Sequence, residues 1–322
     1  MRAVRIHATG SPSVMRVDEI PVPDPGEGQA LVRVDAVGVN FIDIYHRAGR
    51  YAVEVPLTLG QEGAGIVERV GPGVTEVRPG DHVAFSNVGG SYAEYVAAPA
   101  WRLVTVPAAL TPAQAAAAML QGMTAHYLSH ATFPIHPGDT ALVHAAGGGV
   151  GQLLVQMITR RGGRAIGTVS SDAKAALARA AGAEEVINYT QVDFATEVRR
   201  LTGGRGVAVV YDSVGRDTFE QSLDCAALRG MVVLYGQASG PVPPFDPQIL
   251  NAKGGLYLTR PSLNQYTHTR EELLERASDV LGGVAEGTLR LRIDRTFPLD
   301  GAADAHRYLE SRQAAGKLLL IP

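Results

Sequence analysis

The sequence predicts an α/β protein in which a doubly wound parallel sheet is joined to a smaller, all-β region. Three observations support this fold class. Short apolar runs separated by glycine and proline fill residues 1–107, strand and helix patterns alternate over residues 113–261, and a glycine-rich turn joins a strand pattern to a helix pattern at residues 143–151. The first observation indicates β structure without helices, and the other two indicate a nucleotide-binding type of sheet.

The all-β region has its strand patterns between strong turn signals. Pro25-Gly26, Gly71-Pro72-Gly73 and Pro79-Gly80 are the turn signals, and the strand patterns lie at Ala30–Val37, Gly65–Val70 and Asp81–Phe85. Closely spaced strands with no helix between them favour a small antiparallel barrel or sandwich. An alanine-rich segment, residues 113–128, follows and predicts a buried helix.

The middle region alternates strands with helices, which is typical of a parallel sheet covered on both faces. One expected helix, Ser171–Ala181, begins with a serine cap and ends before Gly182. Such sheets bind ligands at the carboxyl ends of their strands. The strand candidates are Thr140–His144, Arg164–Val169, Glu185–Ile187, Gly206–Asp212, Gly230–Gly236 and Leu256–Thr259.

The last sixty or so residues carry two charged amphipathic helix patterns, Arg270–Leu281 and Gly301–Gln313. They are followed by an apolar strand pattern, Lys317–Ile321, with no partner strand nearby in the sequence. We expect this strand to return to the all-β region.

Composition limits the function classes. The chain has 322 residues, enough for about two domains, and a formal net charge of −3 without runs of like charge. Nucleic acids and anionic membranes are therefore not the expected partners. The single cysteine, Cys225, excludes an internal disulfide and a multi-cysteine metal site, which fits a reducing, cytoplasmic location. No signal peptide or membrane-spanning segment is predicted.

The glycine-rich turn has the spacing Ala146-x-Gly148-x-x-Gly151, which is the dinucleotide fingerprint with alanine in place of its first glycine. Glycine at the second position lets a pyrophosphate approach the backbone, and glycine at the third lets the helix pack close to its strand. The alternative is a glycine-rich loop without a ligand. The following strand pattern, one helix later, favours a Rossmann-type unit whose cofactor-binding residues include Ala146, Gly147, Gly148, Gly149, Val150 and Gly151.

Motifs spread over most of the chain resemble those of the medium-chain dehydrogenase/reductase superfamily, and within it the NADPH-dependent, ζ-crystallin-like quinone oxidoreductases. The resemblance implies a GroES-like β-barrel catalytic domain, residues 1–122 and 263–322, and a Rossmann domain, residues 123–262. It is carried by Asn40-Phe41-Ile42-Asp43-x-Tyr45, Gly49-x-Tyr51, Gly60-Gln61-Glu62-Gly63-Ala64-Gly65, Ala145–Gly151, Val186-Ile187-Asn188-Tyr189, Tyr211-Asp212-Ser213-Val214-Gly215, Thr259-Arg260-Pro261-Ser262 and Leu309-Glu310-Ser311-Arg312.

Coenzyme choice depends on the end of the second Rossmann strand. NAD enzymes place an acid there to hold the ribose, whereas this strand ends in Thr168-Val169-Ser170-Ser171 and Asp172 belongs to the next helix. The resemblance implies that Lys174, Tyr189 and Arg312 contact the 2′-phosphate of NADPH, although Lys174 alone reads as a solvated helix residue. Ser170, Ser213, Tyr235 and Gly236 complete the predicted cofactor-binding residues.

The predicted catalytic residues are Asn40, Tyr45, Tyr51 and Thr124. In the zinc-dependent relatives a cysteine lies near Asn40 and a histidine replaces Gln61. Neither is present, so we predict no metal, and the acceptor oxygen then needs hydrogen-bond donors. The resemblance places Asn40 and the two tyrosines on the substrate side and Thr124 against the nicotinamide. The alternative for the tyrosines is that they only pack between domains.

The expected function is zinc-independent transfer of electrons or hydride from NADPH to a quinone. Two alternatives stay open: an NADPH-dependent alkenal/enone reductase, and a weakly catalytic protein that binds nucleotides or RNA. The resemblance also implies a homodimer paired through the edge strand Leu256–Thr259. The physiological acceptor and the proton donor are not evident from the sequence.

Overall fold

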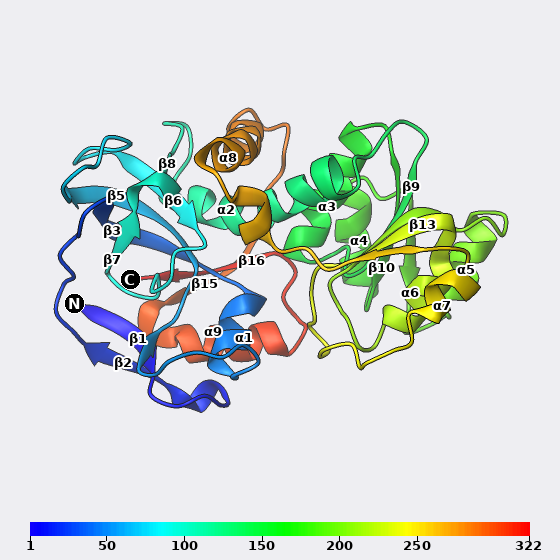
Figure 1. The fold of residues 1–322 in the computed structure, drawn as a ribbon, viewed down its shortest axis with the longest axis horizontal. Coiled ribbons are helices and arrows are strands. Elements are labelled where there is room, and N and C mark those ends of the chain that lie inside the picture. Colours follow the sequence, from blue (N-terminus) through cyan, green and yellow to red (C-terminus); the bar gives the residue numbers. More distant parts are fainter. The chain divides into compact units, whose positions relative to one another are not determined.

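A computed structural model describes all 322 residues. The chain forms two compact units, which are described separately (Figure 1). The first unit contains Met1–Met123 and Thr267–Pro322, and the second contains Thr124–Tyr266. The α/β fold class is confirmed, because the first unit is built on largely antiparallel sheets and the second on a parallel sheet.

The first unit is built on two sheets. The larger has the strand order β15-β16-β3-β5-β6-β8, with β7 also paired to β3, and the smaller has the order β2-β1-β4. The pairs are antiparallel except for β15 with β16. The strands are β1 (Arg2–Ile6), β2 (Met15–Glu19), β3 (Gln29–Val39), β4 (Leu57–Thr58), β5 (Glu62–Val70), β6 (His82–Ser86), β7 (Tyr95–Pro99), β8 (Val104–Thr105), β15 (Ile293–Pro298) and β16 (Lys317–Ile321).

Alternating apolar residues of these strands enclose one core, to which Val32, Phe85 and Leu320 belong. Three helices lie wholly in this unit: α1 (Phe41–Arg47), α8 (Arg270–Ala285) and α9 (Ala302–Glu310). The expectation that residues 1–107 contain no helix was therefore wrong, because α1 is inserted after β3, where Asn40 and Asp43 form a capping box. The alanine-rich segment forms α2 (Pro112–Tyr127), as predicted, and its residues Ala115–Met119 are fully buried.

The predicted return of the C-terminal strand is confirmed. Strand β16 lies between β15 and β3, and its Leu319 is paired with Gly38 of β3. The predicted helix at 301–313 is too long, because α9 ends at Glu310 and Arg312 has a φ of 59° that no helix accommodates. The helix predicted to end at Leu281 instead continues to Ala285.

The second unit is a six-stranded sheet with the order β11-β10-β9-β12-β13-β14, in which every pair is parallel. The chain leaves β9 in one direction through β10 and β11, and then in the other through β12, β13 and β14. This change of direction between β9 and β12 is the switch point at which doubly wound sheets bind ligands. The strands are β9 (Thr140–Val143), β10 (Arg164–Val169), β11 (Glu185–Asn188), β12 (Val207–Asp212), β13 (Ala226–Leu234) and β14 (Tyr257–Thr259).

Five helices connect these strands, and their ends follow from the sequence. The hydroxyl of Ser171 accepts the backbone N–H of Lys174 and caps α4, as predicted, while Gly182 follows that helix with a φ of 108°. The carboxylate of Asp193 caps α5 in the same way. The helices are α3 (Gly149–Arg160), α4 (Asp172–Ala180), α5 (Phe194–Leu201), α6 (Phe219–Cys225) and α7 (Gln248–Ala252).

The predicted strand Gly230–Gly236 is misplaced at both ends. Strand β13 begins at Ala226 and ends at Leu234, and its pairing with β12 shifts between Val207 and Val209. Arg229 has a φ of 59° inside this strand, so an irregularity separates its two halves. The sequence pattern detected only the second, apolar half.

The helices of this chain are all too short or too polar to cross a lipid bilayer.

Candidate functional site

The glycine-rich turn connects β9 to α3 in the second unit (Figure 1). Ala145 has a φ of 52°, and the N–H of Gly148 donates to the carbonyl of Ala145 at 2.8 Å, so the chain turns sharply before the helix. Gly148 is the N-cap residue, and no side chain caps the helix there. The first backbone N–H groups of α3 therefore remain available to an anion, with the helix dipole behind them.

The glycines of this turn are required for different steric reasons. A Cβ on Gly151 would lie 2.7 Å from the Cα of Ala146 and would also overlap the carbonyl of Ala145, so only glycine lets α3 approach the turn this closely. A Cβ on Gly147 would lie 2.8 Å from the Cβ of Lys174. Gly148 carries no side chain at the helix end, which leaves the backbone open to a ligand.

The alanine at the first fingerprint position is accommodated by a glycine on the neighbouring strand. Ala146 is fully buried, and its methyl group lies 2.7 Å from the position that a Cβ on Gly167 would occupy. Gly167 lies in β10, next to β9 in the sheet. The departure from the usual glycine is therefore compensated locally and leaves the turn intact.

Three predicted cofactor-binding residues of the second unit follow β10 and β11, and two of them, Lys174 and Tyr189, are predicted to contact a 2′-phosphate. Lys174 and Ser170 are half-buried, and Tyr189 is 41% exposed. Tyr189 is joined to the end of β10 because its N–H donates to Val169 at 3.1 Å. The carboxylate of Asp172 accepts the side-chain amide of Asn188 at 3.1 Å, so this acid is already engaged. Ser170 directly follows β10, and Asp172 and Lys174 lie in the first turn of α4.

Ser213, Tyr235 and Gly236 lie together after β12 and β13. The N–H of Tyr235 donates to the main-chain carbonyl of Asp212 at 2.8 Å. Burial raises the pKa of the Tyr235 phenol, which is hydrogen-bonded to the side chain of Ser213. A Cβ on Gly236 would lie 2.8 Å from the Cα of Ser213, so glycine is required for this close approach. The structure brings these three predicted residues to one end of neighbouring strands.

Asp212 organises this strand end and was not singled out from the sequence. Its fully buried carboxylate accepts the N–H groups of Val214 and Gly215 and the hydroxyls of Thr218 and Ser222. Ser222 also contacts Nε2 of His144 at 3.0 Å. Burial lowers the pKa of His144, so this imidazole is a neutral part of the framework beneath the glycine-rich turn.

In the first unit, helix α1 carries one of the predicted catalytic residues, Tyr45, with Tyr51 just beyond its end. Tyr45 is buried in α1, and Tyr51 is 38% exposed. Their rings meet edge to face with centroids 5.7 Å apart, and the guanidinium of Arg50 lies 5.3 Å from the Tyr45 ring centroid. The structure therefore joins the two tyrosines into one aromatic pair, from which Tyr51 reaches solvent.

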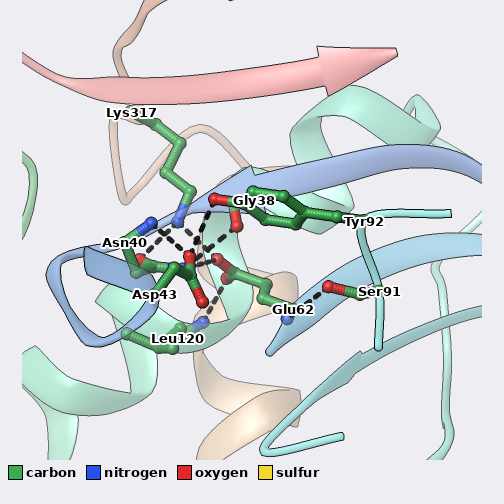
Figure 2. Close-up of polar contacts among 8 residues, drawn as sticks. All are labelled: Gly38, Asn40, Asp43, Glu62, Ser91, Tyr92, Leu120 and Lys317. Carbon is green, nitrogen blue, oxygen red and sulfur yellow. Dashed lines mark hydrogen bonds and ion pairs between the residues drawn. The ribbon is translucent and has the colours of Figure 1, made fainter. Parts of the chain in front are cut away.

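Asn40 directly precedes α1 and is buried in a polar cluster (Figure 2). Its Nδ2 donates to Glu62 at 2.8 Å and to the carbonyl of Gly38 at 3.2 Å, and its Oδ1 accepts the ammonium of Lys317 at 2.7 Å. Lys317 also forms an ion pair with Glu62, and both side chains have no exposed surface. Both amide hydrogens of Asn40 are used inside this unit.

A second set of polar contacts adjoins this cluster and anchors α1 through Asp43 (Figure 2). Asp43 accepts the N–H of Asn40 and the hydroxyl of Tyr92, and Tyr92 contacts Nε2 of His306 at 3.0 Å. Arg47 donates to Nδ1 of His306, so the imidazole proton lies on Nε2 and points at Tyr92. Burial raises the pKa of Asp43 to about 7 and lowers that of His306 to about 3.

The remaining predicted residues are divided between the units. Thr124 is buried in α2 at the first residue of the second unit. Arg312 belongs to the first unit and follows α9 with a φ of 59°.

No role was predicted from the sequence for Glu62 or Lys317. Two features of the sequence indicate such a pair. Lys317 is the first residue of an apolar strand, and Glu62 lies among glycines and alanines, so both charges are expected to be buried and to need partners.

Two family models match the chain. An alcohol dehydrogenase GroES-like domain matches residues 26–108, and a zinc-binding dehydrogenase domain matches residues 181–320. The first match falls within the first unit, and the second covers the later half of the chain.

Full-length relatives decide the family. Quinone oxidoreductase 1 of Escherichia coli is 43% identical over 99% of each chain, and the quinone oxidoreductase of Pseudomonas aeruginosa is 43% identical over 100% of this chain and 99% of its own. The chain belongs to the quinone oxidoreductase family. The sequence resemblance to the medium-chain dehydrogenase/reductase superfamily is thereby confirmed. A 2-haloacrylate reductase of Burkholderia is also 43% identical over 99% of this chain and 98% of its own.

Solved structures of this family have the same fold. The quinone oxidoreductase of E. coli complexed with NADPH has a TM-score of 0.98 at 42% identity, and a mycobacterial protein complexed with NADPH has a TM-score of 0.98 at 46% identity. Both alignments cover 100% of each chain. The doubly wound sheet with a GroES-like unit is therefore confirmed for this quinone oxidoreductase family member.

Replacing Gly151 with alanine tests the close approach of α3 to the turn. We expect Gly151→Ala to lower the free energy of unfolding by about 1–3 kcal/mol, because the added methyl overlaps the backbone of Ala145 and Ala146. Gly282→Ala in α8 is the control: its Cβ would meet nothing within 4 Å, and it should stabilise the helix by up to about 1 kcal/mol. Urea unfolding followed by circular dichroism measures both, and equal effects would contradict the packing argument.

Proposed function

We propose that this chain is an NADPH-dependent quinone oxidoreductase that uses no zinc. The observation that carries the proposal is the turn between β9 and α3, whose uncapped helix start and obligatory glycine suit a dinucleotide pyrophosphate. Full-length relatives named quinone oxidoreductase, one of them complexed with NADPH, support both the coenzyme and the acceptor class.

The residues present fit the coenzyme. The backbone of Ala146–Gly151 would bind the pyrophosphate, and Ser213, Tyr235 and Gly236 would border the ribose and nicotinamide. Lys174, Tyr189 and Arg312, with Ser170, would bind the 2′-phosphate, because a cation and hydroxyl donors favour that dianion. The end of β10 supports this coenzyme choice over NADH, since Val169 and Ser170 carry no carboxylate and Asp172 already accepts the amide of Asn188 through one oxygen.

Bound NADPH supplies the hydride, and the chain supplies orientation and hydrogen bonds. Tyr51 is the candidate donor to the acceptor oxygen, because its partly exposed ring also offers a flat apolar surface to a quinone. Tyr45 supports that ring from α1. We assign Asn40 a holding role, because both its amide hydrogens are used by Glu62 and Gly38. Thr124 remains the candidate for the nicotinamide side.

Zinc independence rests on the residues around Asn40. A catalytic zinc needs about three protein ligands, usually cysteine or histidine. Gln61 stands where the zinc-dependent relatives have a histidine. The cation next to the neighbouring Glu62 is the ammonium of Lys317. This arrangement supports polarisation of the acceptor by hydrogen bonds rather than by a metal.

A conjugated enone is the alternative acceptor. The 2-haloacrylate reductase of Burkholderia acts, by its name, on a haloacrylate, and it is as identical to this chain as the quinone oxidoreductases are. Hydride transfer to such an acceptor would use the same coenzyme and the same tyrosines. No observation favours the third alternative, a weakly catalytic protein that binds nucleotides or RNA, over a reductase.

We further propose a cytoplasmic homodimer in which the first unit is the catalytic domain and the second is the coenzyme domain. Strand β14 is the edge of its sheet, and Tyr257 in it is 61% exposed. Leu228 on the neighbouring strand is 73% exposed. An apolar edge of this kind favours pairing with a second copy across a two-fold axis.

Steady-state kinetics test the function. With 1,4-benzoquinone as acceptor, we expect kcat/KM for NADPH to exceed that for NADH by about tenfold or more, because the 2′-phosphate forms charge-assisted hydrogen bonds. Lys174→Met should reduce this preference, while Arg179→Met, at the exposed end of the same helix, should not. Turnover of small enones without turnover of quinones would favour the alternative, and turnover of neither would refute the proposal.

Sedimentation velocity tests the dimer. We expect the wild-type chain to sediment as a dimer and Tyr257→Lys to sediment as a monomer, because a lysine on the edge strand opposes pairing. Val192→Lys, at another exposed apolar residue of the same unit, should stay dimeric. A monomeric wild-type chain would exclude the interface.

A further inference from the structure

We propose that Lys317 and Glu62 act together as positioning residues that fix the side-chain amide of Asn40 and thereby the start of helix α1, which carries Tyr45. The inference deepens the proposed function, since it assumes that α1 faces the acceptor. Neither residue touches substrate in this account, and both act through Asn40 (Figure 2).

The orientation of the Asn40 amide follows from the hydrogen-bonding capacity of its neighbours. A lysine ammonium has only donors and a carboxylate has only acceptors. Lys317 therefore requires Oδ1 of Asn40 on its side, and Glu62 requires Nδ2 on the other. Turning the amide over would set donor against donor and acceptor against acceptor. The opposite charges of Lys317 and Glu62 therefore select one of the two orientations of the Asn40 amide, although both orientations have nearly the same shape.

Strand register places the three side chains together. Leu318 of β16 is paired with Val39 of β3, so Lys317 lies opposite Asn40. Gly63 of β5 is paired with Val37, so Glu62 lies opposite Gly38. The cluster therefore lies where β3 ends and α1 begins, between its two neighbouring strands.

Gly38 supplies the space for this cluster. A Cβ on Gly38 would lie 2.7 Å from Cε of Lys317 and would also overlap the carboxylate of Glu62. The ion pair consequently packs directly against the backbone of β3. The carbonyl of Gly38 also accepts the second amide hydrogen of Asn40 at 3.2 Å.

The cluster is connected onward to α1. The N–H of Asn40 donates to the carboxylate of Asp43 in the first turn of the helix at 2.8 Å. Glu62 also accepts the backbone N–H of Leu120 in α2, and its own N–H donates to Ser91. Displacement of Asn40 would thus shift the first turn of α1, and with it the aromatic pair of Tyr45 and Tyr51.

Buried ion pairs are weak evidence for stability, because desolvation offsets much of their attraction. Replacing both partners with neutral residues of similar shape often restores stability, whereas removing one partner leaves an uncompensated charge. This difference separates a stabilising role from a positioning role.

The experiment compares Lys317→Met with the double variant Glu62→Gln/Lys317→Met. For Lys317→Met we expect a lower melting temperature and a kcat lower by roughly 100-fold, as expected for misplaced reacting groups. The double variant should recover melting temperature and bind NADPH as tightly as wild type. It should nevertheless keep the low kcat, because the introduced glutamine amide can bond either orientation of the Asn40 amide, so that Asn40 and the start of α1 are no longer held in one position. Lys253→Met, which removes a half-exposed ion pair with Asp224 in the second unit, should leave kcat unchanged.

A double variant that recovers kcat together with melting temperature would overturn the inference, as would an unchanged kcat in Lys317→Met. A wild-type chain without turnover would refute the proposed function but not the inference, which nuclear magnetic resonance then decides. The Asn40 side-chain amide signals, assigned by their loss in Asn40→Asp, should exchange slowly in wild type and faster in the double variant. Equal exchange in both would overturn the positioning role.

Discussion

The ion pair of Glu62 and Lys317 is the contact that fixes Asn40 at the start of α1. It joins residues 255 positions apart, and neither side chain has exposed surface. Such a pair is tolerated in a low-dielectric interior only when further hydrogen bonds complete it, and Asn40 and the N–H of Leu120 do so. The final strand is therefore part of the architecture that holds α1, and not merely a packing element at the chain end.

The second unit depends on a different constraint, which is the close approach of backbone segments to one another. Gly151 lets α3 contact the turn after β9, Gly236 lets two strand ends meet, and Gly167 makes room for Ala146. These contacts contain no charge and leave the start of α3 uncapped. The rigid turn is suited to an anion, while specificity for one dinucleotide depends on side chains such as Lys174 and Tyr189.

Local patterns predicted most of the fold. The turn at residues 143–151 and the serine cap of α4 were evident because periodicity, capping and spacing are local properties. The return of β16 was inferred because no partner strand lies near it in the sequence. The cluster around Asn40 was not, since its partners are distant in sequence and their pairing depends on the register of three strands. The start of β13 and the end of α9 were wrong because residues with positive φ, Arg229 and Arg312, interrupt the patterns there.

A crystal structure of the complex with NADPH tests the coenzyme site. We expect the pyrophosphate to accept backbone N–H groups at the start of α3, and Lys174, Tyr189 and Arg312 to contact the 2′-phosphate. A pyrophosphate bound away from Gly148–Gly151, or a 2′-phosphate without contact to these three side chains, would contradict this expectation.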